Sequence, residues 1–424
     1  MNKAEIQTFS LPQRPWYGDT TLQIELPTTW DAAFLTMPGH AKPKAAREDV
    51  EAAFANPIGT PRISDLAEGR REVAILFDDL SRPTRSCELM PYVLRELREA
   101  GIQDKAVRFV AATGAHRAMS VMEFEKKLGR KVVQRFPVYN HNPYENCTYL
   151  GDTSRGTPVR LNSEVMSCDL KIAVGCIVPH PTAGFGGGAK IMVGISHVDT
   201  IYANHHDVGG RSGPTPDNPM GSLHPSVGLG KVEGNVMRAD LEEMGRMAGI
   251  DCIVNVVVNT KRESVGVFVG DLIAAHREGA KMAQEVYRTK SKGGFDIVVL
   301  NAFSKANEAG IALNATQKLL KAQGGDAVIV CNTPEGQICH YMSRSFGTER
   351  GGRLWGPRTT LPPGVKRMIT VGPNIDPASL DWLGPAGQVI RVKQWPAALK
   401  ILQGTHGPGA KIAIIPDATI QYFT

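Results

Sequence analysis

The sequence is poor in several features that mark common classes of protein. Aromatic residues make up 6% of its 424 residues, and no block of consecutive lysines and arginines stands out. Nucleic-acid binding is therefore not indicated. No run of about 18 apolar residues is present, and the first 21 residues lack the apolar core of a secretory signal. These absences predict a cytoplasmic protein without a membrane segment.

Ligand patterns for a metal held by the protein alone are also missing. The seven cysteines include no C-x-x-C pair and several lie in apolar runs, which is typical of reduced core residues. No HExxH motif occurs. If a metal binds, a cofactor must supply most of its ligands. The net charge of +6 fits an anionic small-molecule partner, although it also serves solubility.

The chain is long enough for two or three domains, and from residue 73 onward strand-like and helix-like patterns alternate. This alternation predicts an α/β protein with two domains, mostly parallel sheets and an active site in the cleft between them. We expect an N-terminal α/β domain at 1–270 that carries the catalytic groups, a helical bridge at 271–290, and a C-terminal α/β domain at 291–424 that closes over substrate. Ser120, followed by Glu123, predicts a helix with a capping box.

The stretch from 175 to 190, GCIVPHPTAGFGGGAK, concentrates features that chemistry explains best. It follows an apolar run that predicts a buried strand. His180 lies between two prolines, which hold its backbone extended. The glycines, Gly186, Gly187 and Gly188 among them, favour close approach to a ligand and leave N–H groups for an anion. Lys190 ends the stretch, but Ala189 and Ile191 exclude a Walker A loop. A plain glycine-rich turn with a core histidine is the alternative.

Two other polar segments follow predicted strands. In DDLSRPT, residues 78–84, Arg82 offers a bidentate fork for a carboxylate or phosphate, and Ser81 and Thr84 offer hydroxyl groups. Asp79 could instead cap the next helix. His116, in TGAHR at 113–117, follows the next strand, and a core histidine is its alternative reading. Because ligands bind at the carboxyl ends of parallel strands, we expect these loops to meet.

Four motifs in this order resemble the nickel-pincer-dependent lactate racemase family and its homologous 2-hydroxyacid racemases and epimerases. They are DDLSRPT at 78–84, TGAHR at 113–117, VPHPTAGFGGGAK at 178–190 and NHH at 204–206. The likeness covers about residues 70–290, with a further similar stretch at 246–279, and is looser beyond.

The resemblance implies a cofactor, its attachment and a set of roles. The cofactor is a nickel-pincer nucleotide, pyridinium-3-thioamide-5-thiocarboxylate mononucleotide with nickel, joined covalently to Lys190. His206 matches the nickel ligand, with His205 as the alternative, and His116 and His180 match the acid and base. Arg82 matches a substrate-binding arginine, and Asp79 an acidic neighbour of the cofactor. The remaining cofactor-binding positions are expected at Ser81, Thr84, Gly186, Gly187 and Gly188. Cofactor-synthesis enzymes are implied partners, and a homo-oligomer is compatible with the family.

This chemistry is coherent for a small-molecule 2-hydroxy acid. A C–H beside a carboxylate is a poor acid, so removing hydride while a base takes the hydroxyl proton is easier and gives a planar 2-keto acid. Return of hydride to the other face inverts the stereocentre. Two histidines that titrate near neutrality suit the two proton transfers.

One departure concerns the substrate. Where lactate enzymes of the family carry an aromatic-polar pair before a substrate-contacting lysine, this chain has Asn314 and Ala315 before Lys318. We therefore expect a substrate larger or more polar than lactate, and the arginines of 343–358 predict a cationic lid, with a solvated loop as the alternative. Lactate racemisation proper, a nucleotide or sugar-phosphate binding protein, and a metal-free racemase that deprotonates the carbon are the other readings.

Overall fold

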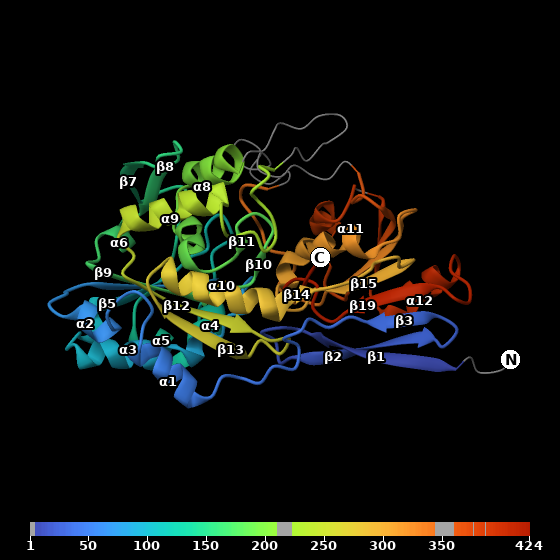
Figure 1. Cartoon of the computed structure of the whole chain (residues 1–424), viewed down its shortest axis with the longest axis horizontal. Coiled ribbons are helices and arrows are strands. Elements are labelled where there is room, and N and C mark those ends of the chain that lie inside the picture. Colours follow the sequence, from blue (N-terminus) through green and yellow to red (C-terminus); the bar gives the residue numbers. More distant parts are fainter. Residues whose placement is uncertain (1–4, 210–222, 344–359, 376, 386) are drawn as a thin grey trace. The chain divides into compact units, whose positions relative to one another are not determined.

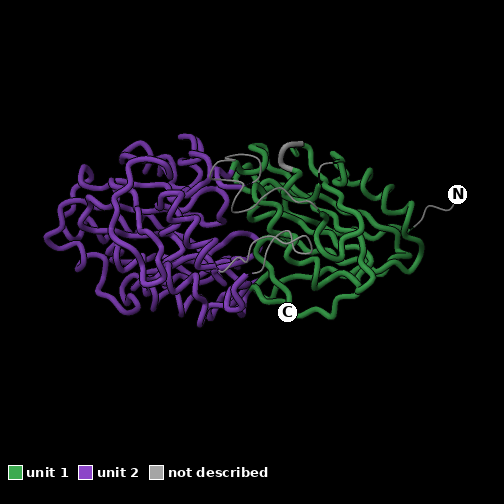
Figure 2. Tube along the Cα trace, turned by 90° about the horizontal axis from the view of Figure 1, so that it is seen from above, with its two compact units in different colours: residues 1–40, 287–339, 355–424 green, residues 41–286, 340–354 purple. Residues whose placement is uncertain are grey.

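The structure, a computed structural model, describes residues 5–209, 223–343, 360–375, 377–385 and 387–424. The chain forms two compact units (Figure 2), one of residues 41–286 and 340–354, the other of residues 1–40, 287–339 and 355–424. The predicted α/β class with mostly parallel sheets is confirmed.

The larger unit is built on a six-stranded sheet in the order β13-β12-β9-β4-β5-β6 (Figure 1). All neighbours are parallel except β12 and β13. The strands are β4 (Val73–Phe77), β5 (Val107–Ala111), β6 (Val138–Asn140), β9 (Leu170–Cys176), β12 (Cys252–Val258) and β13 (Ser264–Gly270). Every residue of β4, β9 and β12 is buried, because helices cover both faces of the sheet, and this explains their unbroken apolar runs.

Helices and short hairpins complete this unit. The α-helices are α1 (Arg47–Ala55), α2 (Ile63–Ala67), α3 (Met90–Glu99), α4 (Val121–Leu128), α5 (Arg130–Arg135), α6 (Ser163–Met166), α7 (Ile191–Gly194), α8 (Val198–Tyr202), α9 (Val236–Ala248) and α10 (Ala274–Tyr287). Shorter turns of helix are η1 (Ser86–Glu88), η2 (Asp104–Ala106), η3 (Gly188–Lys190) and the π-helix η4 (Ala203–Val208). The hairpins pair β7 (Cys147–Asp152) with β8 (Pro158–Asn162) and β10 (Pro179–His180) with β11 (Gly184–Phe185).

The smaller unit contains a second parallel sheet in the order β18-β17-β16-β15-β19-β3. Its strands are β3 (Asp31–Phe34), β15 (Ile297–Asn301), β16 (Gly325–Val330), β17 (Val365–Val371), β18 (Val389–Val392) and β19 (Lys411–Ile415). The remaining elements are β1 (Ile6–Gln13), β2 (Thr20–Pro27), β14 (Arg288–Thr289), β20 (Tyr422–Phe423), η5 (Ala306–Ala315), α11 (Thr316–Leu319), η6 (Pro377–Trp382) and α12 (Trp395–Gln403).

The division of the chain differs from the predicted one at both boundaries. Residues 1–40 belong with the C-terminal unit, because β3 pairs in parallel with β19 at the edge of that unit's sheet. The expected N-terminal domain at 1–270 therefore does not include its first forty residues. A helix does occupy the predicted bridge at 271–290, but α10 belongs to the larger unit.

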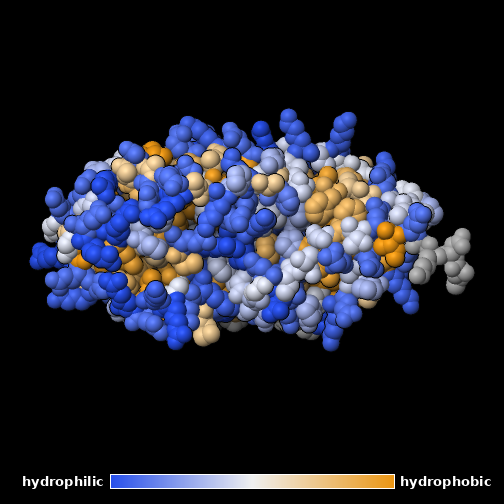
Figure 3. All heavy atoms as spheres, turned by 90° about the horizontal axis from the view of Figure 1, so that it is seen from below, coloured by the Kyte–Doolittle hydropathy of each residue, from blue (hydrophilic) through white to orange (hydrophobic). Residues whose placement is uncertain are grey.

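Local signals in the sequence agree with the structure more closely. Ser120 caps α4 by accepting a hydrogen bond from the N–H of Glu123, whose side chain accepts from the N–H of Ser120, so the predicted capping box is confirmed. In the described residues no helix is long and apolar enough to cross a membrane. The face drawn in Figure 3 is mostly hydrophilic, with small scattered apolar patches.

Candidate active site

The loop after β4 is folded on itself by its own polar side chains. The Asp79 carboxylate accepts hydrogen bonds from the Ser81 N–H, at 2.9 Å, and from the Ser81 hydroxyl. Arg82 donates from Nη1 to the Ser81 carbonyl and to its Oγ, at 3.0 and 2.9 Å. The following helices η1 and α3 have no side-chain cap, so Asp79 does not cap the next helix. These contacts give the loop a defined shape.

A buried lysine that was not predicted from the sequence binds the loop after β4. Lys127, on α4, is fully buried, and its ammonium donates to the Asp78 carboxylate and to the carbonyls of Arg82 and Thr84. The Thr84 hydroxyl also donates to Asp78. Burial raises the pKa of Asp78, and Lys127 opposes that effect. The available signal was the place of Lys127 in the buried stripe of α4, three residues after Phe124.

His116 is oriented by Asp79. Its Nδ1 lies 2.6 Å from Oδ2 of Asp79. A carboxylate only accepts hydrogen bonds, so in the neutral imidazole Nδ1 carries the proton and Nε2 carries the lone pair. Burial raises the pKa of Asp79, but His116 and Arg82 outweigh it and the net pKa lies well below the ordinary value. Asp79 therefore stays charged and prepares His116 to act as a base through Nε2.

His180 is held in the opposite way. Its Nδ1 accepts hydrogen bonds from the N–H groups of Thr182 and Ala183, at 3.3 and 3.2 Å. The Thr182 hydroxyl lies 3.2 Å from the same nitrogen. Backbone N–H groups only donate, so they favour the neutral tautomer with the proton on Nε2. His180 thus presents a hydrogen-bond donor, whereas His116 presents an acceptor.

Packing contacts join the three segments. A Cβ atom at Gly175 would lie 3.4 Å from the Asp78 carboxylate, so the strand that leads to the glycine loop runs beside the loop after β4. The Gly114 N–H donates to the Gly194 carbonyl at 2.8 Å, which brings the TGAHR segment against α7, the helix after Lys190. The expected convergence of these loops is therefore present in the larger unit.

The sequence predicts that N–H groups of the glycine loop are left for an anion, but two of them are bonded inside the protein. The Gly186 N–H donates to the Val178 carbonyl at 2.7 Å, and the Gly188 N–H donates to Oδ1 of Asn255 at 2.6 Å. These two groups are thus used inside the protein, not for an anion. Gly187 and Gly188 have φ of +74° and +53°, and a Cβ on either would approach buried atoms to 2.7 Å. Glycine is required here for close packing.

The Lys190 side chain contacts His205 rather than His206. Its ammonium nitrogen lies 3.1 Å from Nε2 of His205, which is 9% exposed. His206 instead stacks on Tyr202, with ring centroids 4.6 Å apart, and its Nδ1 lies 2.8 Å from Asp207. Neighbouring residues in a helix point in different directions, so only one of the two can face Lys190. His205 is therefore the histidine that contacts Lys190, and the identity of the nickel ligand stays a prediction.

A third histidine lies beside His116. His340 and His116 form an isolated antiparallel bridge, the Tyr341 N–H donates to the Ala115 carbonyl at 2.7 Å, and the two imidazole centroids are 5.1 Å apart. The Met342 N–H donates to Nδ1 of His340 at 3.2 Å. No local motif surrounds His340, and more than two hundred residues separate it from His116, so a single sequence carries no signal for this contact.

The chain is similar in sequence to known proteins. Residues 17–213 match the lactate racemase N-terminal domain. Over 288 residues the chain is 32% identical to the lactate racemase of Thermoanaerobacterium thermosaccharolyticum, a match that covers 67% of this chain and 64% of that protein. The chain belongs to the lactate racemase family. It is also 31% identical over 243 residues to the lactate racemase of Lactiplantibacillus plantarum, covering 57% of this chain and 54% of that one. The chain thus matches less than two thirds of the length of either relative.

The fold of this family member is shared with solved structures. The lactate racemase apoprotein of T. thermosaccharolyticum superposes with a TM-score of 0.71 at 22% identity, covering 99% of this chain and all of that one. A Thermotoga maritima protein has a TM-score of 0.60 at 15% identity, covering 87% of this chain and all of its own. These similarities support the two-sheet α/β architecture.

Two residues that were predicted to contact the substrate are not part of the larger unit. Asn314 and Lys318 belong to the smaller unit, where both are exposed and the Asn314 amide donates to the Ile311 carbonyl at 2.8 Å. Their contact with substrate, and closure of that unit over it, remain predictions. The arginines of the expected cationic lid lie at 344–358, outside the described residues.

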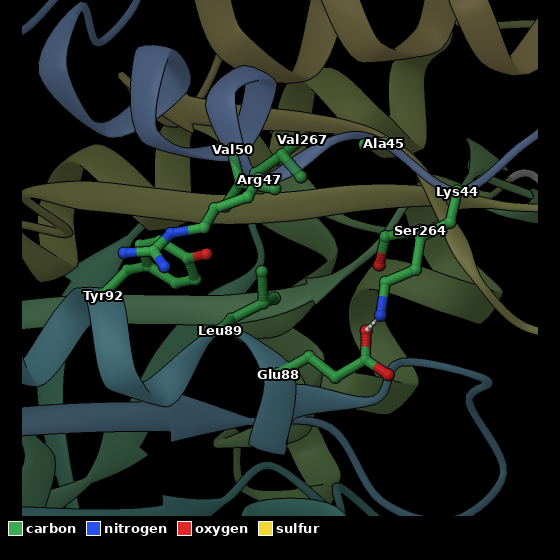
Figure 4. A pocket seen from close by; sticks show the side chains of 9 residues that line it. All are labelled: Lys44, Ala45, Arg47, Val50, Glu88, Leu89, Tyr92, Ser264 and Val267. Atoms are coloured by element: carbon green, nitrogen blue, oxygen red, sulfur yellow. Dashed lines mark ion pairs between the residues drawn. The ribbon is translucent and has the colours of Figure 1, made fainter.

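Among the residues that the structure describes, no group of three or more His, Cys, Asp or Glu side chains is placed to hold a metal ion. A pocket of about 200 Å³ does exist in the larger unit (Figure 4), but no predicted site residue lines it. Its cations are already paired, Lys44 with Glu88 at 2.7 Å and Arg47 with Glu51 at 2.9 Å. The histidine and lysine cluster is therefore the stronger candidate site.

Proposed function

We propose that this member of the lactate racemase family is a racemase or epimerase that inverts the C2 stereocentre of a 2-hydroxy acid. The observation that carries the proposal is the Asp79–His116 contact of 2.6 Å, in the same compact unit as Lys190 and His205. A buried carboxylate that orients an imidazole is the arrangement of a general base. The family match supports racemisation as its use.

The reaction needs two proton transfers coordinated with two hydride transfers. In the first half, Nε2 of His116 takes the proton of the substrate hydroxyl while hydride leaves C2, and a planar 2-keto acid results. In the second half, hydride returns to the other face and the carbonyl oxygen regains a proton. The Nε2–H group of His180 is the donor that its backbone contacts favour. Arg82, anchored to Ser81, is suited to hold the substrate carboxylate.

The residues fit the implied nickel-pincer nucleotide, whose chemistry when bound is to accept hydride and return it. Lys190 is the side chain for the covalent attachment. Nickel bound in this nucleotide would take a nitrogen ligand from the protein, and the buried imidazole of His205, 3.1 Å from the Lys190 ammonium nitrogen, would supply it. We therefore assign the protein's nickel ligand to His205, not to His206.

Intact mass measurement tests this function. Protein produced together with the cofactor-synthesis enzymes should carry an adduct on Lys190 and bind nickel, and Lys190→Ala should lose the adduct and the racemisation of 2-hydroxy acids together. Active protein with an unmodified Lys190 would contradict the assignment. A reversible ligand without metal would favour a nucleotide or sugar-phosphate binding protein instead. Exchange of the C2 hydrogen with solvent deuterium would favour a metal-free racemase that deprotonates the carbon.

The substrate is proposed to be larger or more polar than lactate. Asn314 and Ala315 replace the bulkier groups expected in lactate enzymes, and an amide can hydrogen-bond a hydroxyl group or a second carboxylate. A purpose-built polar contact discriminates by several kcal/mol, whereas one methylene group changes binding by about 1–3 kcal/mol. A malate-like or aldonate-like acid is therefore the preferred class over lactate.

A further inference from the structure

A turn in the connection between β16 and β17 brings a histidine to His116. Both strands belong to the smaller unit, but the turn, residues 340–343, belongs to the larger one. A hydrogen bond of 3.1 Å from the N–H of its last residue to the His340 carbonyl closes the turn. The Tyr341 N–H donates to the Ala115 carbonyl at 2.7 Å, and His340 pairs with His116 in an isolated bridge. The backbone thus fixes His340 beside the proposed base.

The His340 ring is held by its own turn. Its Nδ1 accepts a hydrogen bond from the Met342 N–H at 3.2 Å, and the Ser343 hydroxyl lies 3.2 Å from the same nitrogen. A backbone N–H only donates, so it favours the neutral imidazole with the proton on Nε2. Met342 and Ser343 are at most 1% exposed, so the turn is packed into the protein. His340 is therefore a neutral ring on a fixed support.

Two different contacts hold the His116 imidazole. Asp79 binds its Nδ1 at 2.6 Å, which sets the tautomer. The His340 ring lies with its centroid 5.1 Å from that of His116 and with the two planes at 66°, which is an edge-to-face contact. A hydrogen bond at one nitrogen still leaves the imidazole some freedom to tilt, and an attractive contact on the ring itself restricts that tilt. With both contacts the His116 side chain is only 11% exposed.

We propose that His340 is a positioning residue for the base, whose neutral aromatic ring holds the His116 imidazole in the orientation that lets Nε2 take the substrate proton. The inference rests on the proposed function, in which His116 is that base. A base must lie within hydrogen-bond reach of the proton it takes, so a small tilt of the ring lowers the rate. A second charged imidazole would repel the imidazolium that forms at His116, and the neutral form of His340 avoids this repulsion.

Two substitutions separate the aromatic ring of His340 from its volume. In loaded protein His340→Phe should keep kcat within about twofold of the wild type, because a phenyl ring can make the same edge-to-face contact. His340→Leu fills a similar volume without a ring, so its kcat should fall about threefold to tenfold, the range expected for such a contact. KM should change less than kcat, because the base acts in the transition state. The rates would be measured by chiral chromatography for each loaded chain.

NMR of the full-length apoprotein with ¹⁵N-labelled histidine gives a readout that needs neither cofactor nor turnover. The wild type and His340→Phe should show one His116 tautomer, with the proton on Nδ1. His340→Leu should show signals broadened by exchange, because the ring is less restricted. Tyr341→Leu is the matched control, since Tyr341 is in the same turn but its ring lies against Tyr144, with centroids 6.0 Å apart. It should match the wild type in both measurements.

The leucine variant decides the outcome. Wild-type kcat or wild-type NMR signals of His116 in a folded His340→Leu protein would overturn the inference, because packing volume alone would then explain the residue. If that protein does not fold, His340→Gln takes its place, since it has no ring but can still accept from the Met342 N–H. Loaded wild-type protein that racemises no 2-hydroxy acid, with the NMR difference intact, would count against the proposed function alone.

Discussion

Replacing Asp79 by asparagine should disable His116 without removing it. The Ser81 N–H points at Oδ1 of Asp79 from 2.9 Å and can only donate, so the single oxygen of an asparagine side chain is required there. The amide NH₂ group then occupies the place of Oδ2, 2.6 Å from Nδ1 of His116. Because that group donates, Nδ1 must accept and the proton moves to Nε2. The nitrogen that should receive the substrate proton is then already protonated.

The expected loss follows from the value of a positioned base. General acid-base catalysis contributes about 10²- to 10⁴-fold, which is about 3–5 kcal/mol of transition-state stabilisation. Asp79→Asn should therefore lower kcat by roughly 10²-fold or more, with a smaller change in KM, because the base acts in the transition state. The rate of racemisation of one enantiomer would be measured by chiral chromatography and divided by the fraction of chains that carry the adduct.

Ser81→Ala is the control for the Asp79–His116 contact, since it keeps the Asp79 carboxylate and the backbone N–H, although it removes the hydroxyl that donates to Asp79 and accepts from Arg82. Its rate for each loaded chain should fall less than about tenfold. Acid unfolding gives an independent check. The depressed pKa of Asp79 adds stability that is complete above its unfolded pKa, near 4, and is lost as pH falls below it, so the asparagine variant should lose less stability in acid. A fully loaded Asp79→Asn protein within threefold of the wild-type rate would refute the reasoning.

Three further outcomes are expected. In loaded protein, His205→Ala should lose nickel, measured by elemental analysis, whereas His206→Ala should retain it; the reverse result would restore the assignment made from motif spacing. Burial lowers the pKa of His141 from 6.5 to about 4. Between these pH values the unfolded chain binds a proton at His141 and the folded chain does not, so the free energy of unfolding should fall by about 3 kcal/mol as pH falls from 6.5 to 4. Urea unfolding of His141→Gln should lack that loss, and an unchanged pH dependence would show that other groups cause it. Among 2-hydroxy acids assayed on loaded protein, a larger polar acid should have a higher kcat/KM than lactate, and a clear preference for lactate would contradict the proposed pocket.

The local patterns of the chain were sufficient to predict its class of fold and to predict which polar segments lie together. Unbroken apolar runs predict strands covered on both faces, and β4 and β9 are buried at every residue. Polar residues directly after such strands must lie at one edge of the sheet, which is why Asp79 and His116 could be expected to meet. Ser120 and Glu123 likewise carry their capping box within four residues.

Contacts between distant segments were not accessible in this way. Residues 1–40 join the C-terminal unit because β3 pairs with β19, which lies more than 370 residues later in the chain. The pattern of a single strand does not identify the strand with which it pairs. His205 and His206 are adjacent, so motif spacing cannot tell which faces Lys190; the rotation of the π-helix and stacking on Tyr202 decide it. Arg238 reads as an ordinary helix residue, and its burial beneath the glycine loop follows only when α9 packs against that loop, because burial and the partners of a charge are properties of the packed chain.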